Sequence, residues 1–382
     1  MSTSEPHHGR ARLTAIDGLR AVAAAMVAAY HFLGTPTPHF WGRTELRDSA
    51  PFLHEISRYG WLGVEFFFLI SGFVICMSCW GRTPAQFTVS RIARLFPAYW
   101  CAVLLVVLLV LVSRLGHRPA ATPIDPRTVL GSLTMAPGPL GLDPVDGVSW
   151  TLWVEARFYL LMAALLVLGL SYRRVVVFCG AWLAAAVIAL EIHSPLVDEF
   201  VLPRYTGLFV AGIVLHLMQR FGQSLLHWLL LGFAWCYQLT VLELRVADHS
   251  AVPPGESRPS WVVCAVVLTV CLGLLALAGI GPLTGLRWRW PVTAGALTYP
   301  FYLVHQSLGI PLAKGLVQVF PRLGPVLSTV LSVGCMLGLS LLVHTLVERR
   351  LGPRLRHRLT RDMTLGIRPP DLAARPVPTR TR

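Results

Sequence analysis

Long apolar segments are the feature that most constrains the fold of this chain. Ala102–Val112 is unbroken apolar sequence, and Trp150–Leu170, Val175–Leu190, Val262–Ile280 and Val326–Val347 are largely apolar. A helix of about 20 residues crosses the hydrocarbon core of a bilayer. Only 14% of the residues are charged, whereas a soluble domain carries about 25%. The pattern therefore predicts an all-α, polytopic integral membrane protein and argues against one large soluble domain.

The apolar pattern divides into about ten transmembrane helices. We expect them over residues 15–33, 61–80, 95–113, 150–170, 174–191, 205–219, 225–243, 260–280, 292–312 and 325–347. The first has no cleavage site of the signal-peptide kind, so we expect a retained helix. The predicted domains are an N-terminal tail (1–12), a transmembrane domain (13–350) and a basic, Pro-rich tail (351–382) of disordered type.

The positive charge follows the expected topology. The net charge is +14, and 32 of the 33 basic residues are arginine. A basic total can indicate nucleic-acid binding, but these arginines gather in alternate connections and in the C-terminal tail. That alternation is the positive-inside pattern; its one exception is the connection 313–324, with Lys314 and Arg322. It predicts a plasma-membrane protein with both termini in the cytoplasm and no nucleic-acid partner. Arginine in place of lysine suggests a GC-rich bacterial source.

The cysteines do not form a metal motif. All eight lie in or beside apolar segments, and the CxxC of Cys76 and Cys79 has no second pair. Packing is the better interpretation. The chain also lacks GxGxxG and P-loop motifs, so we expect no permanently bound cofactor and no metal.

The segment DGLRAVAAAMVAAYHF (Asp17–Phe32) carries two costly residues in a membrane helix, Arg20 and His31. Arg20 and His31 are eleven positions apart, and at about 100° per residue this spacing amounts to three helical turns and about 20° more. Both side chains therefore lie on one face of the helix, about 16 Å apart along its axis. Arg20 alone could extend to lipid phosphate, and His31 alone could be a packing residue. Together they indicate a lined cavity, since ionisable residues inside membranes are expensive and usually functional.

A second basic pair, Arg91 and Arg94, lies in SRIARLFPAYW. Their i,i+3 spacing points both side chains the same way, on the expected cytoplasmic side with Arg20. Three converging guanidinium groups would bind phosphate bidentately. Ordinary topology-setting charge is an equally good interpretation from the sequence alone.

Two further segments carry acidic and small polar residues within the membrane. GWLGVEFFFLISGFVI contains Glu65, Ser71 and small residues that allow helices to approach closely. SWTLWVEARFYLL contains Glu155 and Arg157. These two could pair with each other, or Glu155 could face a cavity.

Two C-terminal segments complete the set. GALTYPFYLVHQSL places Tyr302 and His305 at i,i+3, and LVERRLGP places Glu348 at the end of the last span. A surface ion pair with its basic neighbours is the alternative for Glu348.

In this order the six segments resemble the membrane-bound acyltransferase-3 family, which includes bacterial O-acyltransferases of glycans and macrolides. The resemblance covers roughly residues 13–352. Its motifs are a basic residue followed eleven positions later by His (Arg20, His31), GVEFFFLISGF, Arg-x-x-Arg before Pro-x-aromatic (Arg91, Arg94), WTLWVEARFY, TYPFYLVHQ and a late Glu348. Thr151, Arg157 and Thr298 depart mildly from the family pattern.

The resemblance implies transfer of an acyl group from acyl-CoA to a hydroxyl of a sugar, surface glycan or secreted metabolite such as a macrolide. Arg20, Arg91 and Arg94 would hold the donor phosphates. His31 would be a general base or an acyl-accepting nucleophile, and Glu155 would orient its imidazole. Glu65, Ser71, Tyr302, His305 and Glu348 are supporting candidates.

Two other classes remain open from the sequence. A transporter or permease also suits helices with buried charges, although this chain lacks two repeating halves with broken segments. A non-enzymatic membrane assembly partner is the other alternative.

Overall fold

The computed structural model describes residues 14–35, 49–115, 125–250, 258–285, 288 and 290–365, and all regular structure within them is helical. The longer helices are α1 (Thr14–Ala29), α4 (Leu62–Cys79), α5 (Pro84–Leu115), α7 (Trp150–Val167), α8 (Tyr172–Ile192), α10 (Thr206–Phe221), α11 (Leu225–Asp248), α12 (Trp261–Gly279), α13 (Trp290–Val304), α15 (Gly324–Leu342) and α16 (Arg349–Leu365). The shorter ones are α3 (Pro51–Ser57), α6 (Pro126–Leu133), α9 (Pro195–Val201), α14 (Gly309–Val319), the π-helical segments η1 (Tyr30–Gly34) and η5 (Val343–Glu348), and the 3-10 turns η2 (Gly138–Leu140), η3 (Pro282–Gly285) and η4 (Pro321–Leu323).

The helices confirm the all-α, polytopic membrane class. In the described part of the chain, nine helical segments are long and apolar enough to span a membrane. Each corresponds to one expected span. The remaining expected span, 292–312, is divided: α13 ends at Val304 and α14 begins at Gly309. Three consecutive polar residues, His305, Gln306 and Ser307, occupy the break, and Ser307 donates a hydrogen bond to the carboxylate of Asp146, which lies before α7.

The C-terminal segment differs from the sequence prediction. Disorder was predicted from residue 351, but α16 continues to Leu365, so the prediction was wrong for 351–365; residues 366–382 lie outside the described part. Leu351, Leu355 and Leu359 recur every four residues, which places them on one face of a helix. Leu355 and Leu359 are partly buried among exposed neighbours, and α16 packs along α5. The predicted tail 1–12 is also outside the described residues.

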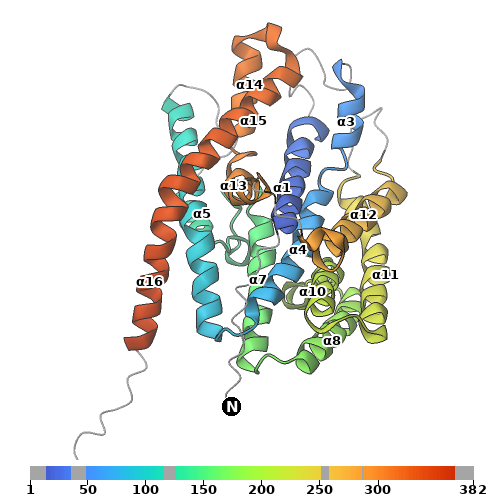
Figure 1. Ribbon diagram of the computed structural model, residues 1–382. Coiled ribbons are helices and arrows are strands. Elements are labelled where there is room, and N and C mark those ends of the chain that lie inside the picture. Colours follow the sequence, from blue (N-terminus) through green and yellow to red (C-terminus); the bar gives the residue numbers. More distant parts are fainter. Residues whose placement is uncertain are drawn as a thin grey trace, which may run out of the picture.

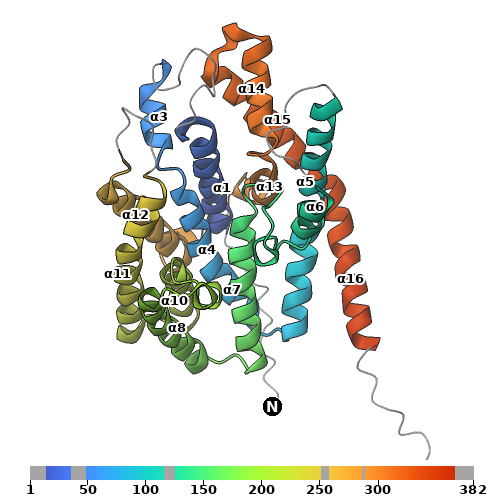
Figure 2. The same ribbon diagram turned by 180° about the vertical axis from the view of Figure 1, so that it is seen from behind.

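Three helices lie at the centre of the molecule. In the two ribbon views α1, α4 and α13 have α5 and α16 on one side and α8, α10, α11 and α12 on the other (Figures 1 and 2). Among these packings, α1 lies against α13 and α4, and α4 lies against α10. This arrangement places the polar residues of α1, α4, α7 and α13 inside the helical bundle.

Two glycines allow the close crossing of α4 and α10. A Cβ at Gly72 would overlap the backbone of Phe209, and one at Gly212 would overlap the backbone of Leu69. Close backbone approach at small residues is a principal means of helix association in membranes. The crossing fixes α4, which carries Ser71 next to Gly72.

We expect Gly72→Ala to destabilise the folded protein, because the new methyl group meets backbone that cannot rotate away. Overpacking of this kind costs roughly 1–3 kcal/mol. The matched control is Gly334→Ala on α15, where a Cβ would meet no atom within 4 Å. The measurement is the thermal unfolding midpoint of each purified protein in the same detergent. Equal midpoints for the two variants would contradict the packing role of Gly72.

Candidate active site

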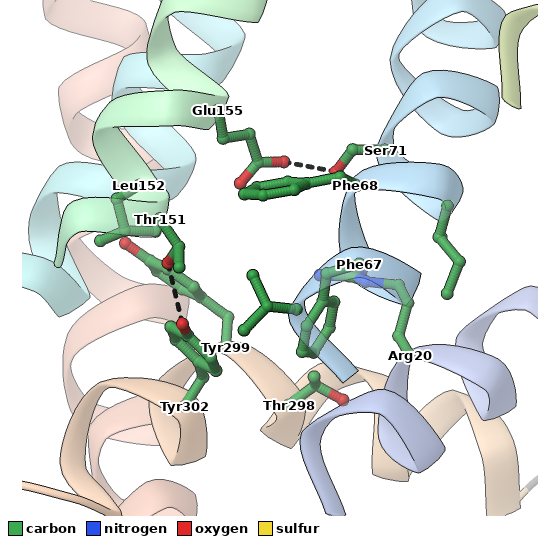
Figure 3. A pocket seen from close by; sticks show the side chains of 12 residues that line it. Arg20, Phe67, Phe68, Ser71, Thr151, Leu152, Glu155, Thr298, Tyr299 and Tyr302 are labelled. Carbon is green, nitrogen blue, oxygen red and sulfur yellow. Dashed lines mark hydrogen bonds between the residues drawn. The ribbon is translucent and has the colours of Figure 1, made fainter. Parts of the chain in front are cut away.

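Two small cavities adjoin each other inside the bundle. The first, here the tyrosine cavity, has a volume of about 70 Å³ and includes Thr151, Leu152 and Tyr302 among its lining residues (Figure 3). The second, here the arginine cavity, has a volume of about 50 Å³ and is lined by residues that include Arg91 and Arg94. The residues that line both are Arg20, Ile70, Ser71, Glu155 and Tyr299. The cavities are therefore successive parts of one polar site.

Three guanidinium groups line the arginine cavity, as their sequence positions predicted. Arg20 comes from α1, and Arg91 and Arg94 come from consecutive turns of α5. Arg91 lies over the aromatic rings of Phe87 and Tyr159, at 5.7 and 5.9 Å from the ring centroids. Among the described residues no carboxylate oxygen lies within 4.0 Å of these guanidinium groups. The cavity thus has an excess of positive charge, which suits an anionic ligand.

A hydrogen-bonded pair lies where the two cavities meet. The Ser71 hydroxyl of α4 donates to Glu155 Oε1 of α7 at 2.7 Å, and Figure 3 shows the pair above Arg20 in that view. Glu155 also interacts electrostatically with Arg20. Of the two sequence interpretations of Glu155, the cavity-facing one is confirmed, since Arg157 pairs with Glu199 at 2.8 Å instead.

A second polar pair lines the tyrosine cavity. Tyr302 Oη and Thr151 Oγ1 lie 2.8 Å apart in a hydrogen bond. The pair joins α13 to the first turn of α7, so Thr151, a mild departure from the family pattern, supplies a hydroxyl at this position. Tyr302 lines the cavity, and its ring also contacts that of His305.

The candidate histidines lie beyond Tyr302. His305 is fully buried, its Nδ1 is 2.8 Å from the Tyr302 carbonyl oxygen, and its Nε2 has no hydrogen-bond partner among the described residues. Its ring centroid lies 5.6 Å from that of Tyr302 and 5.4 Å from that of His31. The sequence predicts one cavity lined by both Arg20 and His31, and Arg20 does line both cavities. His31, however, is not among the residues lining either cavity.

The expected contact between Glu155 and His31 is not present. Glu155 accepts a hydrogen bond from Ser71, while His31 makes ring contacts with Tyr30 and His305. The prediction that Glu155 orients the His31 imidazole was therefore wrong. Its reason is geometric: Glu155 faces the part of α4 that carries Ser71, and η1 carries His31 toward the end of α13.

Glu65 lies outside both cavities. Its Oε1 accepts a hydrogen bond from Arg245 Nε at 2.8 Å, in a pair that is almost fully buried. Arg245 also contacts Asp248 at 3.0 Å and lies 5.7 Å from the centroid of the Trp61 ring. A buried ion pair of this kind is strongly destabilised when one partner is removed. Glu65 therefore joins α4 to α11.

Glu348 lies nearer the arginine cavity. Its carboxylate contacts His344 Nδ1 at 2.6 Å, one helical turn earlier, and it interacts electrostatically with Arg94 and Arg20. The alternative interpretation of Glu348, a surface ion pair with its neighbouring arginines, therefore does not match the structure, in which Glu348 pairs with His344.

Several site residues were missed from the sequence. Arg245 lies beyond the expected end of its span at residue 243, and Tyr159, Tyr299 and Thr151 were read only as parts of motifs. Asp146 lies before α7, fully buried and hydrogen-bonded by Ser307; burial raises its pKa to about 6. An acidic residue directly before GVSW was the available signal.

In the described part of the chain no group of three His, Cys, Asp or Glu residues is arranged to hold a metal ion.

The sequence of this chain is similar to those of known proteins. The model of the acyltransferase domain of the acyltransferase-3 family matches residues 13–345. The chain belongs to this family. It is 28% identical over 318 residues to the acyltransferase MdmB of Streptomyces mycarofaciens, a match that covers 77% of this chain and 78% of that protein. It is 26% identical over 335 residues to nodulation protein 10 of Rhizobium leguminosarum bv. viciae, covering 79% and 86%. No solved structure matches the chain.

Family membership makes this chain an acyltransferase with membrane-spanning helices. The family match contains every candidate site residue except Glu348, which lies three residues beyond its end. The roles of the individual residues follow from the geometry and are proposed below.

Proposed function

We propose that this protein is a membrane O-acyltransferase that moves an acyl group from acyl-CoA to a hydroxyl of a sugar, surface glycan or secreted natural product such as a macrolide. One observation supports this most: a cavity with three guanidinium groups continues into a cavity with hydroxyl and phenol groups, and five residues line both. A donor with an anionic end and a reactive end fits that order.

The donor would lie along the two cavities. Coenzyme A is a polyanion joined to a long pantetheine arm, so its phosphates belong with Arg20, Arg91 and Arg94. Its thioester then extends past Ser71 and Glu155 toward Tyr302. The Ser71 hydroxyl already donates to Glu155, which fixes the direction of both groups. We assign Glu155 a positioning role at this junction, in place of an orienting role toward His31.

The acceptor would approach from the side of the histidines. His31 takes the proton of the acceptor hydroxyl as the oxygen attacks the thioester carbon. The new carbon–oxygen bond forms, the carbon–sulfur bond breaks, and the thiolate of coenzyme A leaves. A two-step route, in which His31 first carries the acyl group, uses the same atoms. His305, 5.4 Å from His31 between ring centroids, is placed to position that imidazole.

The expected topology gives the two substrates different entrances. The alternation of arginines along the chain predicts that Arg91 and Arg94 lie at the cytoplasmic end of α5. This is the side of the membrane on which acyl-CoA is made. We therefore expect reporter fusions at the N- and C-termini both to report the cytoplasm, in a plasma membrane. Fusions that placed the two ends on opposite sides would contradict this assignment and would require an odd number of spans.

The test of the proposed function is a transfer assay. Membranes containing the protein are incubated with acetyl-CoA labelled in its acyl group, together with an extract of the source cells, and esters are identified by mass spectrometry. The proposal predicts a labelled ester that is absent with membranes lacking the protein. Label that crosses sealed vesicles without forming an ester would support a transporter instead.

A further inference from the structure

A large apolar groove adjoins the tyrosine cavity. It has a volume of about 800 Å³ and is formed by α1 with its following segment, by α13 and by α15. Its lining is apolar apart from the threonines Thr293, Thr298 and Thr329. The volume lies within the ~300–1,000 Å³ range of ligand pockets, whereas the tyrosine cavity, at about 70 Å³, is far smaller.

The groove and the tyrosine cavity share a boundary on two helices. Thr298 of α13 lines both, and its hydroxyl donates to its own helix at Ala294 O, at 3.0 Å. On α1, Arg20 lines the cavity, and Ala24, one turn further, lines the groove. Residues four apart lie on one helix face, so the two spaces follow each other along the same surface of α1.

The wall that α1 presents to the groove consists of small side chains. Five alanines of α1 line it, namely Ala21, Ala24, Ala25, Ala28 and Ala29. Alanine leaves an open trough where leucine or phenylalanine would fill the space. Phe32 and Leu33, in the segment that follows α1, also line the groove.

We infer that this groove holds the acyl chain of the donor, so that the enzyme accepts acyl groups longer than acetyl. The inference rests on the proposed function, because it places the thioester in the tyrosine cavity. That cavity has room for the reacting carbonyl and little more, so a longer chain needs a continuation. The apolar groove beyond Thr298 supplies this continuation. Its apolar lining suits an acyl chain, because each buried methylene strengthens binding by about fourfold.

The test compares dissociation constants of free CoA, acetyl-CoA and octanoyl-CoA for the full-length protein in nanodiscs, corrected with protein-free nanodiscs. Ala25→Phe places a ring at an exposed, groove-lining position of α1, where it narrows the groove without overpacking the buried core. Val22→Phe is the matched control: Val22 is 46% exposed on the same helix and is not among the residues lining the groove.

We expect octanoyl-CoA to bind wild type and Val22→Phe at least tenfold more tightly than acetyl-CoA. In Ala25→Phe this ratio should fall to threefold or less. If free CoA and acetyl-CoA bind but octanoyl-CoA binds no more tightly, the groove holds bilayer lipid and the inference is wrong, while the proposed function stands. If Ala25→Phe and Val22→Phe keep the same ratio, the chain lies elsewhere. If none of the three ligands binds, the proposed donor fails as well.

Discussion

His31→Ala is expected to reduce acyl transfer by roughly 10²–10⁴-fold, the usual contribution of a general base. Alanine cannot accept the hydroxyl proton, and it cannot carry an acyl group, so both routes open to His31 are lost. His31 is only partly buried and contacts Tyr30 and His305 through its ring. We therefore expect the variant to insert and fold normally.

The measurement for His31 is the initial rate of ester formation by purified protein at saturating donor. His357→Ala is the control, because His357 is exposed on α16 and should leave the rate unchanged. Comparable rates for wild type and His31→Ala would remove His31 from the chemistry. His305 and Glu155 would then be the next candidates.

Arg94→Lys is expected to raise the KM for acyl-CoA by about tenfold to a hundredfold, with little change in the KM for acceptor. Lysine keeps the positive charge but loses the planar pair of donors that binds phosphate bidentately. A hydrogen bond to a charged group contributes roughly 1.5–3 kcal/mol, which corresponds to that range in affinity. Arg20→Lys should have a milder effect, because the family pattern accepts either basic residue there.

The control for Arg94 separates phosphate binding from topology. Arg173 is exposed directly after the start of α8, in a connection that the arginine pattern places on the same side of the membrane. If both arginines only set orientation, lysine should replace either without cost, since the positive-inside rule counts both residues. An unchanged donor KM in Arg94→Lys, equal to that of Arg173→Lys, would leave the donor site unlocated.

Much of the fold could be predicted because span length and apolarity are local properties of the sequence. Nine of the expected spans correspond to long apolar helices in the described residues. The break in 292–312 could not be found by the same means, since apolar residues lie on both sides of His305, Gln306 and Ser307. The helix over 351–365 was missed because arginine and proline content masked the leucines that recur every four residues.

The site was predictable only where its residues share one helix. Arg91 and Arg94 are one turn apart on α5, so their common direction followed from spacing. The Glu65–Arg245 pair joins residues 180 positions apart, and nothing local distinguishes such a pair from two unrelated charges. The same limit applied to Glu155, whose partner proved to be Ser71, 84 residues earlier.

The central claim is that the arginine cavity binds the phosphate end of a coenzyme A donor. Its most direct test is equilibrium binding of coenzyme A and of pantetheine, which lacks the nucleotide phosphates, to wild type and Arg94→Lys in nanodiscs. The account predicts that wild type binds coenzyme A far more tightly than pantetheine and that Arg94→Lys weakens only the binding of coenzyme A. Equal affinity of wild type for both ligands, or no binding of coenzyme A, would contradict it.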